Sequence, residues 1–273
     1  MSAAAPHTGP EPVVRLRKPG GAAARRVLLL HGLAGSTSVW GPFTERAGPS
    51  LEVWEAELPW SPAGDTRWSH AVDPSPWVRA ALAAVPGGAD VLIAHSFAAN
   101  ISLEVLAAGG PELPAAAVLV APFHRPAPAD FDWETLSYYL NGFHRILEEG
   151  LRVTAGDRLP PDLVEAMAVR VRDRIGPYGW MRFFDAYLRS PFTDLTALGL
   201  PVLVVAGDRD FAAPPDDARA QAGSLADAVL DVFEDCGHFP MAEHPDRFAQ
   251  AVRSFTAGRP GTTLTDPSRY VRS

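Results

Sequence analysis

The stretch Val91-Leu-Ile-Ala-His-Ser-Phe-Ala-Ala-Asn100 carries the strongest structural signal in the chain. A continuous apolar run ends at His95, a single serine follows, and an alanine-rich segment then predicts a helix over 97–108. A strand that turns sharply into a helix at one serine is typical of a nucleophile elbow, which holds the hydroxyl at the sheet edge beside a helix N-terminus. Ser96 is therefore a candidate nucleophile, and an ordinary helix N-cap is the alternative.

Similar apolar runs recur along the chain and predict a parallel sheet. They lie at 27–30, 91–94, 117–120, 202–205 and 228–233, and the segments 13–16 and 51–58 are two further expected strands. Most of these runs are nearly uninterrupted, as in strands that are buried on both faces of a parallel sheet. Helical patterns follow at 76–85, 97–108, 215–226 and 244–257. The alternation predicts an α/β fold with a mostly parallel central sheet flanked by helices.

The alternation is interrupted between Phe123 and Asp194, where the sequence predicts helices near 132–150, 160–175 and 178–189. We therefore expect a core in two parts, 1–122 and 195–257, with a helical cap over 123–194 inserted between two core strands. Residues 1–11 and 258–273 lack periodic apolar residues, so we expect a loose arm and a flexible C-terminal tail there.

The expected cap is rich in aromatic residues. It holds 12 of the 25 Phe, Trp and Tyr residues in about a quarter of the length, which is typical of a lid over an apolar pocket. The alternative is that these rings only pack the insertion onto the core. The candidate substrate-binding residues are Phe123, Trp133, Tyr138, Tyr139 and Trp180 in the cap, and Trp60 in an early loop.

Composition excludes several classes of protein. The formal net charge is −8, with 24 Lys and Arg against 32 Asp and Glu. Because no dense basic cluster is present, nucleic acid and anionic membranes are not expected partners. No run approaches 18 apolar residues and no signal peptide is evident. The one cysteine, Cys236, excludes an intrachain disulfide and a Cys-based zinc cluster, and we expect a cytoplasmic location.

The loop after the run at 27–30 can supply groups that stabilise an oxyanion. Gly32 and Gly35 allow its backbone to approach a ligand closely. A serine nucleophile needs backbone N–H donors aimed at the substrate oxygen, and the N–H groups of Leu33 and Phe97 are the candidates. His31 is interpreted as a structural residue of the same loop.

An acid and a base follow in two later loops. Asp208 and Asp210 both come after the run at 202–205, and we expect Asp210 to be the acid because it lies further beyond the strand, whereas Asp208 would brace the turn. His238 is expected to be the base, and His244 a surface residue. The joint order of oxyanion loop, Ser, Asp and His, each at a strand end, favours a serine hydrolase.

With these segments the sequence resembles the α/β-hydrolase superfamily. The resemblance rests on HGLAGSTSVW (31–40), AHSFA (94–98), PVLVVAGDRD (201–210) and CGHFPMAEHP (236–245). It implies an α/β-hydrolase fold, with Ser96 as nucleophile, Asp210 as acid, His238 as base and the amides of Leu33 and Phe97 as oxyanion hole. Alanines stand at 94 and 98, where the usual elbow has glycine. Serine at 96 argues against the haloalkane-dehalogenase and epoxide-hydrolase branches, which need an aspartate.

The expected function is hydrolysis of a small carboxylic ester or thioester through an acyl-enzyme, with an apolar or aromatic acyl group. Three alternatives stay open: a biosynthetic acyltransferase or cyclase, a cofactor-free lyase on the same triad, and a non-catalytic ligand-binding module. No metal ligand set and no phosphate-binding glycine loop is convincing, so we expect no cofactor.

Overall fold

A computed structural model describes residues 11–196 and 198–258. Most of the expected loose arm and all but the first residue of the expected tail lie outside these described residues. Seven strands of the described chain form one sheet in the order β1-β3-β2-β4-β5-β6-β7. They are β1 (Val13–Lys18), β2 (Arg25–Leu30), β3 (Leu51–Glu57), β4 (Val91–His95), β5 (Ala116–Val120), β6 (Val202–Gly207) and β7 (Ala228–Phe233).

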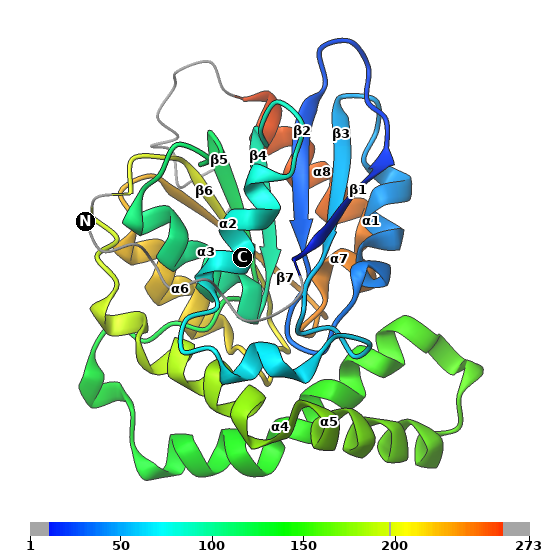
Figure 1. The fold of residues 1–273 in the computed structure, drawn as a ribbon, viewed down its shortest axis with the longest axis vertical. Coiled ribbons are helices and arrows are strands. Elements are labelled where there is room, and N and C mark those ends of the chain that lie inside the picture. The colour runs from blue at the N-terminus through cyan, green and yellow to red at the C-terminus, as the bar shows by residue number, and fades with distance from the viewer. Residues whose placement is uncertain (1–10, 197, 259–273) are drawn as a thin grey trace.

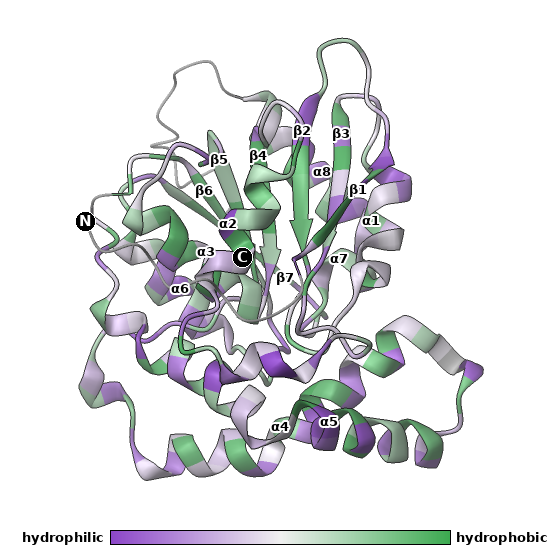
Figure 2. Ribbon diagram, viewed as in Figure 1, coloured by the Kyte–Doolittle hydropathy of each residue, from purple (hydrophilic) through white to green (hydrophobic). Residues whose placement is uncertain are grey.

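The sheet is parallel except at one edge, where β1 pairs antiparallel with β3. The central strands are apolar at nearly every position because both faces of the sheet are covered, as Figure 2 shows for β2, β4, β5 and β6. Alternate residues of one strand enter opposite cores. In β2, Leu28 and Leu30 belong to one buried cluster, whereas Val27 and Leu29 belong to the other.

Helices cover the two faces of the sheet (Figure 1). One face carries α2 (Ser75–Ala83), α3 (Phe97–Ala108) and α6 (Pro215–Ser224), and the other carries α1 (Gly41–Arg46), α7 (Pro240–Glu243) and α8 (Pro245–Ala257). Short 3₁₀ segments are η1 (Thr37–Trp40), η2 (Thr66–His70), η3 (Pro128–Asp130), η4 (Gly156–Arg158) and η5 (Ser190–Phe192). The predicted α/β architecture is confirmed.

Two long helices, α4 (Trp133–Ala155) and α5 (Pro161–Leu188), join β5 to β6 and lie across the end of the sheet to which the parallel strands point (Figure 1). The expected helices at 160–175 and 178–189 are the two halves of α5, which are separated by a kink with non-helical backbone at Gly176, whose φ is 66°. The kink has a local cause, because Pro177 provides no backbone N–H and disfavours helical backbone in the residue before it. We call α4 and α5 the cap.

None of the helices that the structure describes is both long and apolar enough to span a bilayer.

Candidate active site

Ser96 occupies a strained turn between β4 and α3. Its φ is 56° and its ψ is −125°, a conformation that residues with a side chain rarely adopt. The Ser96 N–H donates to the Val120 carbonyl of β5 at 2.8 Å, which ties the turn to the sheet. Ala94 and Ala98 are fully buried on either side, so the elbow accommodates a methyl group at both positions. The turn therefore presents the serine at the strand end.

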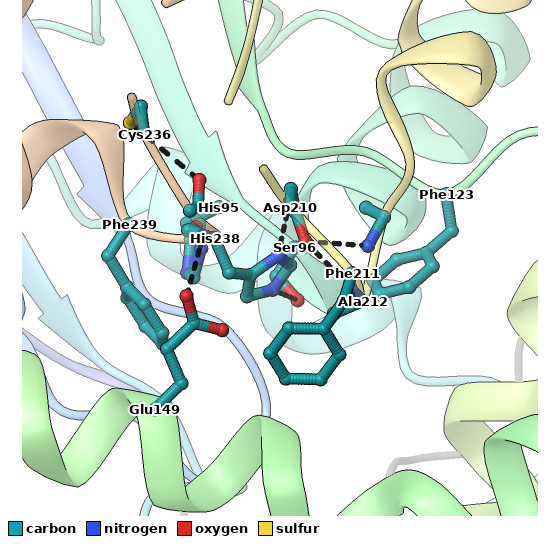
Figure 3. Close-up of polar contacts among 12 residues, drawn as sticks. His95, Ser96, Phe123, Glu149, Asp210, Phe211, Ala212, Cys236, His238 and Phe239 are labelled. Atoms are coloured by element: carbon teal, nitrogen blue, oxygen red, sulfur yellow. Dashed lines mark hydrogen bonds and ion pairs between the residues drawn. The ribbon is translucent and has the colours of Figure 1, made fainter. Parts of the chain in front are cut away.

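The structure brings Ser96 together with the expected base and acid. Ser96 Oγ lies 2.9 Å from His238 Nε2, and His238 Nδ1 lies 2.7 Å from Asp210 Oδ2. Ser96 is 8% exposed, Asp210 3% and His238 1%. Figure 3 shows the three side chains converging from three loops at one edge of the sheet. They form one continuous chain of hydrogen bonds from hydroxyl to carboxylate.

The two aspartates after β6 have different contacts. Asp210 Oδ1 accepts from the N–H groups of Ala212 and Ala213 at 2.8 and 2.9 Å, which orients its other oxygen toward His238. Asp208 instead accepts from the Cys236 N–H at 3.1 Å. The hydrogen bond from Cys236 to Asp208 thus joins the loop that carries the acid to the loop that carries His238. Of the two aspartates, only Asp210 reaches the imidazole.

The environment of His238 favours its protonated form. Burial alone would lower the pKa of the imidazole, but the adjacent Asp210 carboxylate, together with Glu149 and Glu243, outweighs burial, and the pKa lies above its usual value. His95 packs beside it and its Nε2 donates to the His238 carbonyl at 2.8 Å. Burial and the nearby His238 hold the pKa of His95 well below its usual value, so the His95 imidazole is neutral. It supports the loop 234–239 between β7 and α7, which carries His238 and which we call the histidine loop.

The predicted oxyanion-hole residues flank Ser96. Leu33 lines the same cavity as Ser96, and Phe97 is the first residue of α3, where a backbone N–H has no carbonyl of an earlier turn to bond. The loop before Leu33 is fixed by His31: its Nε2 accepts from the Leu58 N–H at 3.0 Å, and its Nδ1 lies 2.9 Å from the Gly32 carbonyl. A Cβ at Gly32 would lie 3.0 Å from the Ser96 Cβ, so glycine allows this close approach.

A cavity of about 270 Å³ opens above Ser96, between the oxyanion loop and the cap. Its wall is mostly aliphatic, with Phe239 as the aromatic side chain other than the two histidines. Of the described residues that line it, none is Lys or Arg. The aliphatic lining comprises Leu33, Ala34, Val39, Pro62, Ile146, Leu147, Leu151, Met167 and Val171.

The six predicted substrate-binding aromatics do not line this cavity. Trp133 is 83% exposed on the outside of α4. Tyr138, which is half exposed, donates its hydroxyl to the Phe211 carbonyl at 2.7 Å, and the buried Tyr139 donates to the Ala212 carbonyl at 2.8 Å. Both tyrosines therefore bind the loop 208–214, which carries Asp210 and which we call the acid loop, and do not line the cavity.

The remaining three candidates are packing residues. The Trp60 indole is buried against the Phe97 ring and donates to the His31 carbonyl at 3.1 Å. Phe123 packs edge-on against rings of the cap, with its centroid 5.8 Å from that of His238. Trp180 stacks on Phe184 within the cap. The six aromatic residues therefore lie between cap and core, within the cap or on its surface, and none of them lines this cavity.

Two glutamates that bind the histidine loop were not among the sequence candidates. Glu243 follows the loop by a few residues and accepts from the N–H groups of Gly237 and Phe239, each at 2.8 Å. Glu149 comes from α4 and accepts from the His238 N–H at 3.2 Å. In the sequence, Glu149 has the pattern of a surface charge on a helix, and no local signal indicates its partner. The described residues contain no group of three or more His, Cys, Asp and Glu arranged to hold a metal ion.

Comparison with known proteins places this geometry in a family. Residues 27–251 match the family described as Alpha/beta hydrolase family. A 2-hydroxymuconate semialdehyde hydrolase of Pseudomonas putida is 39% identical over 70 residues, which are 26% of this chain and 25% of that protein. A 2-hydroxy-6-oxononadienedioate/2-hydroxy-6-oxononatrienedioate hydrolase of a Pseudomonas species is 36% identical over 63 residues, 23% and 22% of the two chains. The matches span about a quarter of these relatives.

Solved structures align with about nine tenths of the chain. A bacterial membrane phospholipase A aligns with a TM-score of 0.68 at 20% identity, covering 91% of this chain and 86% of the other. An esterase from Rhodococcus sp. ECU1013 aligns with a TM-score of 0.62 at 20% identity over 90% and 95% of the two chains. For a meta-cleavage product hydrolase from Pseudomonas fluorescens IP01 the TM-score is 0.64 at 17% identity, over 90% and 95%. At these identities the likeness shows the fold and not the substrate.

Proposed function

This chain belongs to the alpha/beta hydrolase family, and on that premise we propose that it is a serine hydrolase that cleaves a small carboxylic ester or thioester through an acyl-enzyme. The observation that carries the proposal is the hydrogen-bonded sequence Ser96–His238–Asp210 at the base of a cavity. A hydroxyl becomes an effective nucleophile when a neighbouring imidazole accepts its proton and a carboxylate orients that imidazole.

The reaction follows from the positions of these groups. Ser96 Oγ attacks the substrate carbonyl while His238 Nε2 takes its proton, and Asp210 stabilises the imidazolium that forms. The N–H groups of Leu33 and Phe97 receive the oxyanion of the tetrahedral intermediate. His238 then returns the proton to the leaving alcohol or thiol. Water attacks the acyl-enzyme by the same steps and releases the acid.

The cavity favours a small, neutral, aliphatic acyl group. Its volume of about 270 Å³ lies near the lower end for ligand pockets, and the cap contributes branched and unbranched aliphatic side chains. Of the apolar and aromatic acyl groups expected from the sequence, the lining supports a short aliphatic one, because the aromatic residues of the cap lie elsewhere.

A carbon–carbon bond hydrolase is the second candidate, because the partial sequence matches are to proteins of that kind. The name of one relative describes its substrate as a dioate, which denotes two carboxylates. Burying a carboxylate in an apolar cavity is costly unless a cation pairs with it. The described lining of this cavity offers no Arg or Lys, so the lining favours a neutral ester.

Hydrolysis of 4-nitrophenyl acetate and butyrate, and of the matching thioesters, tests the proposal. We expect the wild type to release stoichiometric acid, and Ser96→Ala to lose at least about 10³-fold in kcat/KM. Ser102→Ala is the matched control, because Ser102 lies on the same helix and its buried hydroxyl has no partner among the described residues. A folded wild type that turns over none of these substrates would contradict the proposal, and acyl transfer to an added alcohol in preference to water would favour the acyltransferase.

A further inference from the structure

The backbone of the histidine loop is held by two carboxylates. Three consecutive N–H groups, at 237, 238 and 239, donate to glutamate side chains. Glu243 binds the first and third from α7, which follows the loop directly in sequence. Glu149 binds the middle one, that of His238, and comes from α4 in the cap. One of the two supports is therefore part of the catalytic core, and the other belongs to the inserted helices.

Two glycines allow α4 and the histidine loop to approach each other closely. A Cβ at Gly237 would collide with Glu149 Oε1, so glycine there allows the carboxylate to approach the loop. On the helix side, a Cβ at Gly150 would lie 2.9 Å from the Phe239 ring. Figure 3 shows Glu149 extending from α4 to the loop, with Phe239 beside it. Helix and loop thus meet at consecutive residues on both sides.

Burial of the Glu149 carboxylate is unfavourable in free energy, which would not be so for a carboxylate on the surface. Its Oε2 is buried and has no partner among the described residues. Burial raises the pKa of the Glu149 carboxyl, and the nearby His238 acts in the opposite direction. An unpaired buried carboxylate oxygen is unfavourable, so the interaction that this carboxylate makes with the histidine loop is the compensating contact.

We propose that Glu149 is a positioning residue of the reaction: from the cap it holds the backbone of His238, and its negative charge stabilises the imidazolium that forms when Ser96 loses its proton. The inference rests on the proposed function, because it assigns a role within that site. It also makes the cap a part of the catalytic arrangement, since the contact from α4 completes the support of the base.

The charges around His238 determine the direction in which loss of the Glu149 charge shifts the pKa of His238. Four titratable groups face it from four elements: Asp210 after β6, Glu149 on α4, Glu243 on α7 and His95 at the end of β4. Asp210 is the strongest of the groups that raise the pKa of His238, and Glu149 follows it. Removing the charge at 149 therefore lowers the pKa of His238. The acid limb of the activity profile then moves to lower pH, because the imidazole is neutral over a wider range.

Glu149→Gln separates charge from hydrogen bonding, because an amide oxygen still accepts from the His238 N–H. We expect Glu149→Gln to keep KM and move the acid limb of kcat/KM for 4-nitrophenyl butyrate to lower pH. In Glu149→Ala we expect the same move of the acid limb to lower pH. We also expect a loss of about 10- to 100-fold in kcat, because the histidine loop then lacks the hydrogen bond from the cap. Glu148→Gln is the matched control, because Glu148 lies next in the chain and pairs with Arg152. It should retain the wild-type profile.

Titration of the His238 imidazole by ¹⁵N NMR in the same full-length variants separates this inference from the proposed function. A lowered pKa of His238 in Glu149→Gln but not in Glu148→Gln supports the inference even if the wild type hydrolyses no ester. An unchanged imidazole titration in folded Glu149→Gln overturns it, as does an equal shift in both variants. Thermal melting of each variant establishes that the protein is folded.

Discussion

Ser96, His238 and Asp210, joined through the imidazole of His238, decide the chemistry at the scale of single side chains. The positive φ of Ser96 turns its hydroxyl toward His238 Nε2, which lies 2.9 Å away. On the other side of the ring, two backbone N–H groups orient Asp210 so that one oxygen remains for Nδ1. Each of the three groups is held by backbone contacts, so the arrangement is present before a substrate binds.

The two aspartates after β6 allow a test of this assignment. Asp210→Asn removes the charge that stabilises the imidazolium and orients the ring, and we expect kcat to fall by about 10³- to 10⁴-fold. Asp208→Asn keeps most of the activity, because Asp208 accepts only from the backbone at the base of the turn. Steady-state kinetics on 4-nitrophenyl acetate compares them. Loss of activity in Asp208→Asn with retention in Asp210→Asn would reverse the assignment.

At the scale of secondary structure, α4 connects the two loops that carry the acid and the base. Tyr138 and Tyr139 bind carbonyls of the acid loop, and Glu149 binds the histidine loop. Glu149 lies ten positions after Tyr139, about 15 Å along the helix axis, so one rigid element spans both sides of the triad. The same helix places Ile146, Leu147 and Leu151 in the cavity wall. Catalytic support and substrate contact therefore share one element.

The size of the cavity is expected to depend on this helix. Leu151→Ala shortens a wall residue and should admit a longer acyl group, so the ratio of kcat/KM for hexanoate over acetate esters rises about tenfold or more. Leu140→Ala on the same helix is the control, because Leu140 is 55% exposed and does not line the cavity. An unchanged chain-length preference in Leu151→Ala would mean that the acyl group binds elsewhere.

At the scale of the whole molecule, the parallel sheet gathers distant segments at one edge. The loops after β2, β4, β6 and β7 contribute Leu33, Ser96, Asp210 and His238, and the cap encloses them from the same side (Figure 1). The strands and helices of this core were predictable, because buried parallel strands leave continuous apolar runs and each run is bounded by turn residues. The candidate triad was predictable as well, since each member stands just after such a run.

The cavity wall and the support from the cap were not predictable from local pattern. The aromatic residues of the cap are enriched, yet a ring packs equally well between cap and core as beside a substrate, and sequence does not distinguish the two. Phe123 and Tyr139 illustrate this, since both are buried within that interface. Glu149 is separated from its partner His238 by 89 residues, so only the folded chain reveals the contact.

The most direct test of the account is covalent labelling by a fluorophosphonate, with the modified residue located by peptide mass spectrometry. We expect one adduct, on Ser96, which forms rapidly in the wild type and in Ser102→Ala. It should be lost in Ser96→Ala and form much more slowly in His238→Ala. Absence of an adduct on folded wild-type protein, or an adduct on a different residue, would contradict the claim that this serine is the nucleophile.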